Sequence, residues 1–216
     1  MDAGAASVGT EAPLSALLRK ETKVAHRLAE GTRLARAFFT GKLTVARYAE
    51  GLARLYPVYV AMEDALCALA ADHPLRGFCL PRVFRADAML ADLRHFGVSP
   101  EPLRAGAATR YHARIVELTQ PTQTLLVAHA YVRYMGDVSG GIIAGRVAQR
   151  VLRLPSREGL AFFAFDGIPD PDVFRREFRA LLDALPRDRA ETRAIVAEAN
   201  LAFDLNRALA EEVWDA

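Results

Sequence analysis

The chain has little of what would place it in a membrane, on a nucleic acid or in a secretory pathway. Its 216 residues contain no apolar run near the ~18 residues that a membrane-spanning helix needs. The formal net charge is only +2, which provides no bulk attraction to nucleic acid. The N-terminal stretch lacks both the basic and the apolar segment of a secretory signal. We therefore expect a soluble cytoplasmic protein without a membrane anchor.

Cysteine and lysine are also scarce. The two cysteines, Cys67 and Cys79, form neither a Cys-x-x-Cys motif nor a metal-ligand spacing. In a reducing cytosol we expect two buried free thiols rather than a disulfide. The basic residues are almost all arginine, with lysine only at Lys20, Lys23 and Lys42. We attribute this bias to codon usage, so the abundance of arginine carries no functional weight.

The apolar residues recur with helical spacing nearly throughout, and no alternating strand pattern or internal repeat is present. Helices are expected over residues 14–31, 44–72, 86–96, 109–118, 122–154, 170–185 and 188–213. Pro57 should kink the second of these. The expected N-caps are Thr44, Thr122, Asp170 and Asp188, the last with Glu191 at capping-box spacing. The sequence thus predicts an all-α fold, with one compact domain over residues 14–216 after a disordered tail over residues 1–13.

A glycine cluster lies inside the long helix expected over residues 122–154. Four of the chain's 14 glycines fall within three turns: Gly136, Gly140, Gly141 and Gly145. Each costs about 1 kcal/mol relative to alanine in a helix interior. Close packing through small residues, a helix break at Gly140–Gly141, or close approach of the backbone to a flat ligand would each explain the cluster. Gly136 and Gly140 share a helix face, with Arg133 and Asp137 beside it.

Two further groups are candidates for ligand binding. His26 lies at the edge of an apolar helix face, one turn before Glu30 and two turns after Arg19. Such a histidine is either a hydrogen-bonded structural residue or a metal ligand, as in haem proteins. Arg175 and Arg179 are an i, i+4 pair that forms either a solvated basic face or a carboxylate-binding pair. The remaining histidines show no ligand pattern and are interpreted as structural or surface residues: His73, His95, His112 and His129.

Together, these segments resemble haem oxygenases of the biliverdin-forming type. The stretch LLVAHAYVRYMGDVSGG resembles the family's distal-helix signature, and ETKVAHRLAE resembles its proximal-helix segment. LYPVYVAMED, LPSREGLAFFAF and EANLAFDLN are similar to other family stretches in the same order, so the resemblance runs from about Leu14 to Trp214. It implies a helical domain that holds haem between a proximal N-terminal helix and a kinked, glycine-rich distal helix.

The resemblance also implies roles for individual residues. His26 would be the axial ligand of the haem iron, with Glu30 beside it, and Gly136 and Gly140 would lie over the porphyrin. Asp137 matches the acid that orders distal water. Its hydrogen-bonded network would include Tyr59, Arg133 and Asn206. The positions that face the haem propionates would be Arg19, Tyr131, Arg175 and Arg179, with Arg19 standing where lysine is common.

The implied activity is cleavage of haem b by dioxygen to biliverdin, carbon monoxide and ferrous iron, with haem as both cofactor and substrate. No Rossmann or flavin motif is present, so electrons would come from an external reductase or a ferredoxin-type donor. We expect a monomer that binds no nucleic acid. Two alternatives remain open: a non-catalytic haem-binding carrier or sensor, and a helical enzyme of similar architecture with a different small substrate.

Overall fold

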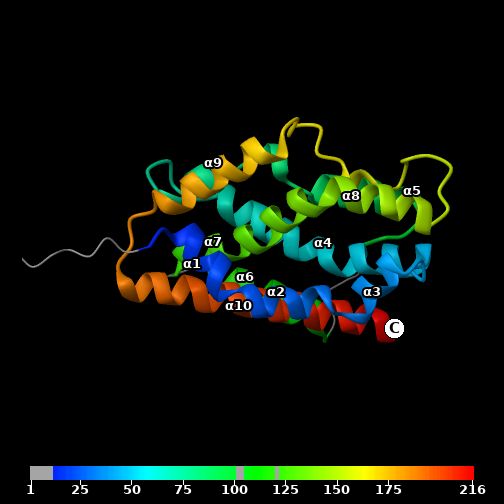
Figure 1. Ribbon diagram of the computed structural model, residues 1–216, viewed down its shortest axis with the longest axis horizontal. Coiled ribbons are helices and arrows are strands. Elements are labelled where there is room, and N and C mark those ends of the chain that lie inside the picture. The colour runs from blue at the N-terminus through cyan, green and yellow to red at the C-terminus, as the bar shows by residue number, and fades with distance from the viewer. Residues whose placement is uncertain (1–11, 101–104, 120–121) are drawn as a thin grey trace, which may run out of the picture.

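The computed structural model describes residues 12–100, 105–119 and 122–216, and within these ranges the regular structure is entirely helical. The helices, in chain order, are α1 (Leu14–Glu21), α2 (Lys23–Glu30), α3 (Arg33–Phe39), α4 (Val45–Cys67), α5 (Ala86–His95), α6 (Ala107–Glu117), α7 (Leu126–Ala130), α8 (Gly136–Val151), α9 (Pro171–Asp183) and α10 (Arg189–Asp215) (Figure 1). The expected all-α fold is confirmed. Most of the expected N-terminal tail, residues 1–11, lies outside the described residues.

The helix expected over residues 14–31 is two helices, α1 and α2, which meet at Thr22. The buried Thr22 hydroxyl donates a hydrogen bond to the Leu18 carbonyl oxygen at 2.7 Å. Threonine bonds of this kind to the preceding turn bend helices. A further short helix, α3, was not expected from the sequence; the Thr32 hydroxyl caps it by accepting from the Ala35 amide at 3.3 Å. The N-terminal segment from α1 to α3 runs alongside α10 (Figure 1).

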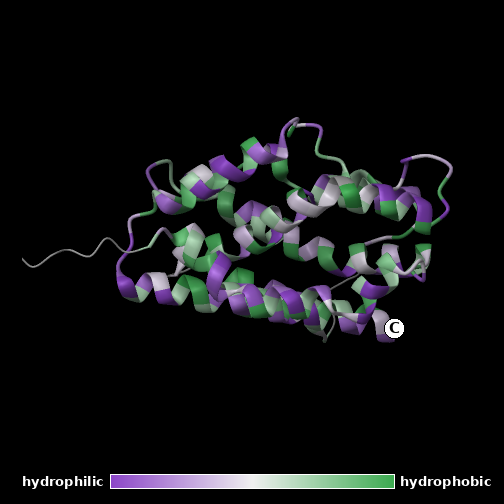
Figure 2. Ribbon diagram, in the orientation of Figure 1, coloured by the Kyte–Doolittle hydropathy of each residue, from purple (hydrophilic) through white to green (hydrophobic). Residues whose placement is uncertain are grey.

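Helix α4 runs through the middle of the domain and packs against α5, α6 and α10. It contains Pro57 without ending there, and its buried side chains Val58, Tyr59, Met62 and Leu66 belong to the main hydrophobic core. Hydrophobic and hydrophilic residues alternate along the helices (Figure 2), as expected of amphipathic elements around one core. No helix in the described ranges is both long enough and apolar enough to cross a membrane.

Three of the four expected N-caps are confirmed. Thr44 accepts from the Arg47 amide, and Asp170 accepts from two amides at the start of α9. Asp188 and Glu191 form the reciprocal capping box of α10. The prediction for Thr122 was wrong: its side chain makes no cap hydrogen bond, because a 3₁₀ turn over Gln123–Leu125 precedes α7.

The glycine-rich segment is helical from α7 to α8, with a π-helical turn over Tyr131–Met135 between them. The glycines themselves lie in α8, whose helix continues through Gly140 and Gly141. A helix break at these two glycines is therefore excluded. The irregularity lies one turn earlier, in the π turn, a feature that occurs frequently at functional sites.

The expectation of two free thiols was wrong: Cys67 and Cys79 form a disulfide. Cys67 ends α4, and the chain turns back through a 3₁₀ turn over Pro74–Phe78. This reversal brings the two Cα atoms to 5.0 Å, within the usual range for a disulfide. The two cysteines are 12 residues apart in the sequence, and this spacing did not indicate that the chain reverses between them.

Candidate functional site

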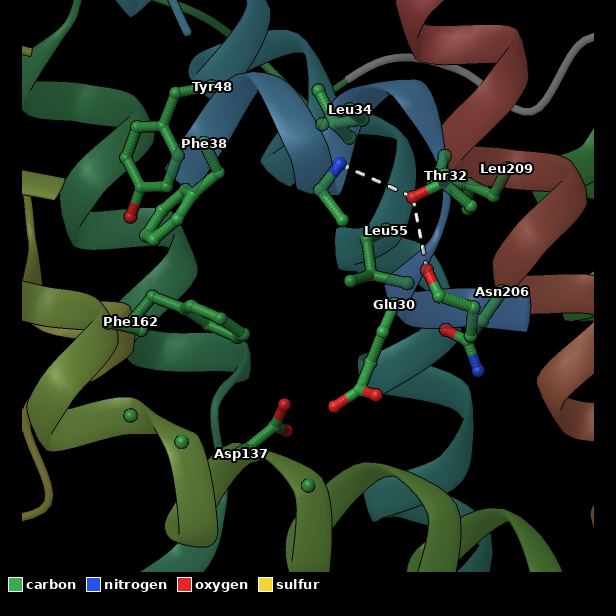
Figure 3. Close-up of a pocket in the computed structure, with 18 of the residues that line it drawn as sticks. Glu30, Thr32, Leu34, Phe38, Tyr48, Leu55, Asp137, Phe162, Asn206 and Leu209 are labelled. Carbon is green, nitrogen blue, oxygen red and sulfur yellow. Dashed lines mark hydrogen bonds between the residues drawn. The ribbon is translucent and has the colours of Figure 1, made fainter. Parts of the chain in front are cut away.

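A largely apolar cavity of about 450 Å³ lies between α2 and α3 on one side and α8 on the other, with α4 and α10 completing its walls. Figure 3 shows Asp137 projecting from α8 into this space, while Glu30 enters from the opposite wall. The apolar lining includes Leu34, Leu55 and Phe162. A cavity with apolar walls and a few convergent polar groups is the usual form of a cofactor site.

The four glycines of α8 divide into two pairs with different surroundings. A Cβ atom added at Gly136 or Gly140 would meet no other atom within 4 Å, and both residues line the cavity. A Cβ atom at Gly141 would lie 2.5 Å from Phe165 Cε2, and one at Gly145 would lie 3.0 Å from Phe163 Cβ. Gly136 and Gly140 thus keep the cavity open along the helix. Gly141 and Gly145 permit close packing on the other side, which is the first of the three explanations. The open space beside Gly136 and Gly140 fits the third, in which the backbone approaches a flat ligand.

His26 enters the cavity from α2, on the wall opposite the glycines. Its Nδ1 atom lies 3.4 Å from Glu30 Oε2, and its ring packs edge-on against Phe203 with centroids 5.5 Å apart. A carboxylate at one ring nitrogen orients the imidazole and leaves the other nitrogen for a metal. The side chain is 51% exposed, so Nε2 is accessible to a ligand that enters the cavity. This arrangement fits the axial-ligand role expected for His26.

The distal acid and the three residues expected around it meet in one hydrogen-bonded network. The Tyr59 hydroxyl donates to Asp137 Oδ2. Arg133 donates from Nε to the Tyr59 hydroxyl at 2.7 Å, from Nη1 to Asn206 Oδ1 at 2.6 Å and from Nη2 to Asp137 Oδ1 at 3.2 Å. These side chains come from α4, α8, α10 and the π turn, so the network ties the four elements together behind the cavity.

Burial controls the electrostatics of this network. It raises the pKa of Asp137, and the positive charge of Arg133 and the Tyr59 hydrogen bond offset only part of that rise. Burial also raises the pKa of Tyr59 well above its ordinary value. Burial alone would lower the pKa of Arg133, but Asp137 and Tyr59 outweigh it and raise the pKa. Asp137 is therefore a carboxyl group that keeps its proton up to a higher pH than an exposed aspartate does.

The network extends further than the sequence indicated. Asn206 Nδ2 lies 3.4 Å from the Tyr111 hydroxyl, which in turn lies 3.4 Å from His129 Nδ1. His129 Nε2 lies 2.9 Å from Glu198, and Arg114 binds the same carboxylate through two nitrogens. Burial lowers the pKa of His129, although the hydrogen bond and charge of Glu198 act in the opposite direction. In a neutral ring, a donor at Nε2 would face the Glu198 carboxylate and an acceptor at Nδ1 would face the Tyr111 hydroxyl.

No local signal in the sequence marked His129 as part of the site. It is fully buried, and its partners Tyr111 and Glu198 are 18 and 69 residues away. Only the packing of α6 and α10 against the segment from α7 to α8 brings them together.

The four expected propionate-facing residues do not line the cavity. Three of them share one electrostatic environment. Burial raises the pKa of Tyr131, while a hydrogen bond with Thr22 and the positive charges of Arg179 and Arg19 lower it by a smaller amount. Arg175 instead pairs with Asp172, one turn earlier on α9. Arg19, Tyr131 and Arg179 therefore form a basic group beside the junction of α1 and α2.

Comparisons with known proteins agree with this geometry. Residues 12–212 match the family model described as Heme oxygenase. A heme oxygenase of Guillardia theta is 34% identical over 203 residues, covering 93% of this chain and 86% of that protein. The heme oxygenase structure from Leptospira interrogans has a TM-score of 0.88 at 35% identity, covering 93% of this chain and all of that one. The structure of heme oxygenase-1 from Synechocystis sp. in complex with heme has a TM-score of 0.87 at 34% identity, covering 93% and 92%.

The chain therefore belongs to the haem oxygenase family. The resemblance found in the sequence is confirmed over nearly its whole length, and so is the helical fold that it implied.

Proposed function

We propose that this protein binds haem in the cavity between α2 and α8 and opens the porphyrin ring with dioxygen, forming biliverdin, carbon monoxide and ferrous iron. The observation that carries the proposal is the pair Gly136 and Gly140 opposite His26. A Cβ atom at either glycine would stand in open space within the cavity. A flat ligand at van der Waals distance from the helix backbone needs hydrogen at these positions.

On the proximal side, His26 would hold the haem iron through Nε2 while Glu30 fixes the imidazole by Nδ1. The edge contact with Phe203 restrains rotation of the ring. Bound haem would supply the iron at which dioxygen is activated. Arg19, Tyr131 and Arg179, which share one electrostatic environment, would pair with its propionates, as forked guanidinium groups do with carboxylates.

On the distal side, Asp137 would order a water molecule that delivers protons above the haem plane. Tyr59 and Arg133 hold both carboxylate oxygens, so the side chain has little freedom to turn away. Asn206 fixes Arg133 in turn. A positioned acid–base group of this kind contributes typically about 10²–10⁴-fold to a rate. This network supports an enzyme rather than a haem carrier, since holding haem requires no fixed acid on the distal side.

The reaction consumes electrons, which an external reductase or a ferredoxin-type protein would supply, because the sequence contains no nucleotide-binding or flavin-binding motif. The proposal is tested by adding hemin to the purified protein, then ascorbate in air, and recording the absorption spectrum. We expect the Soret band to decay while biliverdin absorbance grows. A Soret band that persists through repeated reduction would indicate a haem carrier or sensor instead.

A further inference from the structure

One short segment lies between the distal helix, α8, and helix α9, which does not line the cavity. The residues Ala161–Phe165, here called the phenylalanine segment, follow α8 and include a 3₁₀ turn over Ala161–Phe163. Its side chains Phe162 and Phe163 line the cavity. Figure 3 shows Phe162 reaching into the cavity above the distal helix. The Phe162 ring also packs edge-on against Tyr59, with centroids 6.1 Å apart.

The same segment fits closely against α8. Phe165 occupies the space that a side chain at Gly141 would need, and Phe163 does the same at Gly145. Gly141 and Gly145 therefore fix the distance between the distal helix and the cavity wall. Any shift of the phenylalanine segment would move this wall and the distal helix relative to each other.

Two buried charged residues hold the segment by its backbone. Asp92, fully buried on α5, accepts hydrogen bonds from the Ala161 amide at 2.6 Å and the Phe162 amide at 2.9 Å. The Tyr48 hydroxyl, which lines the cavity, also donates to Asp92 at 3.3 Å. One carboxylate thus joins the cavity wall, α4 and α5.

Arg85 holds the carbonyl side of the same segment. It is 6% exposed, and its Nη1 atom donates to the carbonyl oxygens of Phe162, at 3.3 Å, and Ala164. Its guanidinium carbon lies 4.1 Å from the centroid of the Phe165 ring. Burying charged groups is costly unless their hydrogen bonds are satisfied. Here the Asp92 carboxylate and the Arg85 guanidinium both form hydrogen bonds with the backbone of one five-residue segment. Apolar side chains would fill the space but would not fix the backbone.

We propose that Asp92 and Arg85 are positioning residues: by fixing the wall made by Phe162 and Phe163, they determine how haem is rotated in its plane and therefore which of its edges is opened. The inference rests on the proposed function, because it concerns the orientation of haem in that cavity. Haem held by one histidine can rotate in its plane. The basic group near Tyr131 would restrain one side of the plate, and the phenylalanine wall is a steric stop on another.

The test compares Asp92→Asn with Asp87→Asn, an exposed carboxylate on the same helix. Asparagine keeps the size of the side chain, but its amide nitrogen cannot accept a hydrogen bond from the second backbone amide. The biliverdin isomers formed from hemin are separated by chromatography. We expect the minor isomers to increase severalfold in Asp92→Asn and in Arg85→Lys, whereas Asp87→Asn keeps the wild-type isomer ratio.

Two further measurements separate this inference from the proposed function. Haem methyl shifts in the NMR spectrum of the cyanide-ligated ferric complex report in-plane haem orientation without turnover. Hydrogen exchange of the Ala161 and Phe162 amides in the apoprotein reports whether the segment has been released. A wild-type protein that binds haem but forms no biliverdin would contradict the proposed function. In that case the methyl shifts would still show whether Asp92 and Arg85 control the in-plane orientation of haem.

The inference is overturned if Asp92→Asn loses amide protection while its isomers and methyl shifts stay unchanged. It is also overturned if Asp87→Asn changes them equally. If Asp92→Asn does not fold, Gly141→Ala decides in the same way, because its added methyl group pushes the segment from the distal side.

Discussion

Replacing Gly140 and Gly141 by alanine, one at a time, should stabilise the apoprotein in the first case only. Both are interior residues of α8, so each replacement gains about 1 kcal/mol of helix propensity. A methyl group at Gly140 meets nothing within 4 Å, so the gain should appear nearly in full. A methyl group at Gly141 would lie 2.5 Å from Phe165 Cε2 and 3.2 Å from its Cδ2. Overpacking of this kind costs ~1–3 kcal/mol, so Gly141→Ala should be neutral or destabilising by up to ~2 kcal/mol.

Urea unfolding of the two apoproteins measures this difference directly. Haem titration should rank the two alanine variants differently from unfolding, with Gly140→Ala the weaker binder, because its methyl group lies in the cavity where haem would bind. Gly140→Leu should weaken haem binding further. A stabilised Gly140→Ala with weakened haem binding would show that glycine is kept there for the ligand. Equal stabilisation by both alanines would refute the division of the glycines into two pairs.

Three other perturbations follow from the structure. His26→Ala should abolish the axial histidine ligation seen in the haem spectrum while the apoprotein stays folded, since the side chain is 51% exposed, and added imidazole should restore part of the activity. Burial raises the pKa of Glu63 from 4.5 to about 7, so the folded state holds a proton that the unfolded chain releases. Wild-type stability should therefore fall by at most ~3 kcal/mol as pH rises through this window, and urea unfolding of Glu63→Gln should lack that fall. Charge reversal of Arg179 should weaken haem binding or alter the isomer mixture more than reversal of Arg175, which already pairs with Asp172.

Periodicity and capping chemistry are local, and they predicted most of the fold. The apolar spacing located the long helices, and Asp188 with Glu191 marked the start of α10 correctly. The break at Thr22 and the short helix α3 were missed, because a single threonine bond and a seven-residue helix leave little periodic signal.

The site was predictable where residues lie on one helix and not where distant segments meet. The spacing of Gly136 and Gly140 is the same as that of Gly141 and Gly145, so the sequence alone could not assign one pair to the ligand and the other to packing. That assignment depends on Phe165, which lies 24 residues after Gly141 in the sequence and packs against the Arg85 guanidinium. The disulfide was missed for the same reason: a chain reversal brings the two thiols together.

The central claim is that Asp137 delivers protons through bound water to haem held by His26. The most direct measurement is the rate of biliverdin formation by haem-loaded Asp137→Leu, in single turnover with the same reductant as the wild type. Leucine is similar in size and apolar, and the carboxylate makes no bond to the iron in this account, so haem should stay bound. The rate should fall by about 10²–10⁴-fold, with Asp137→Asn in between. Biliverdin formation by Asp137→Leu at the wild-type rate would contradict the account.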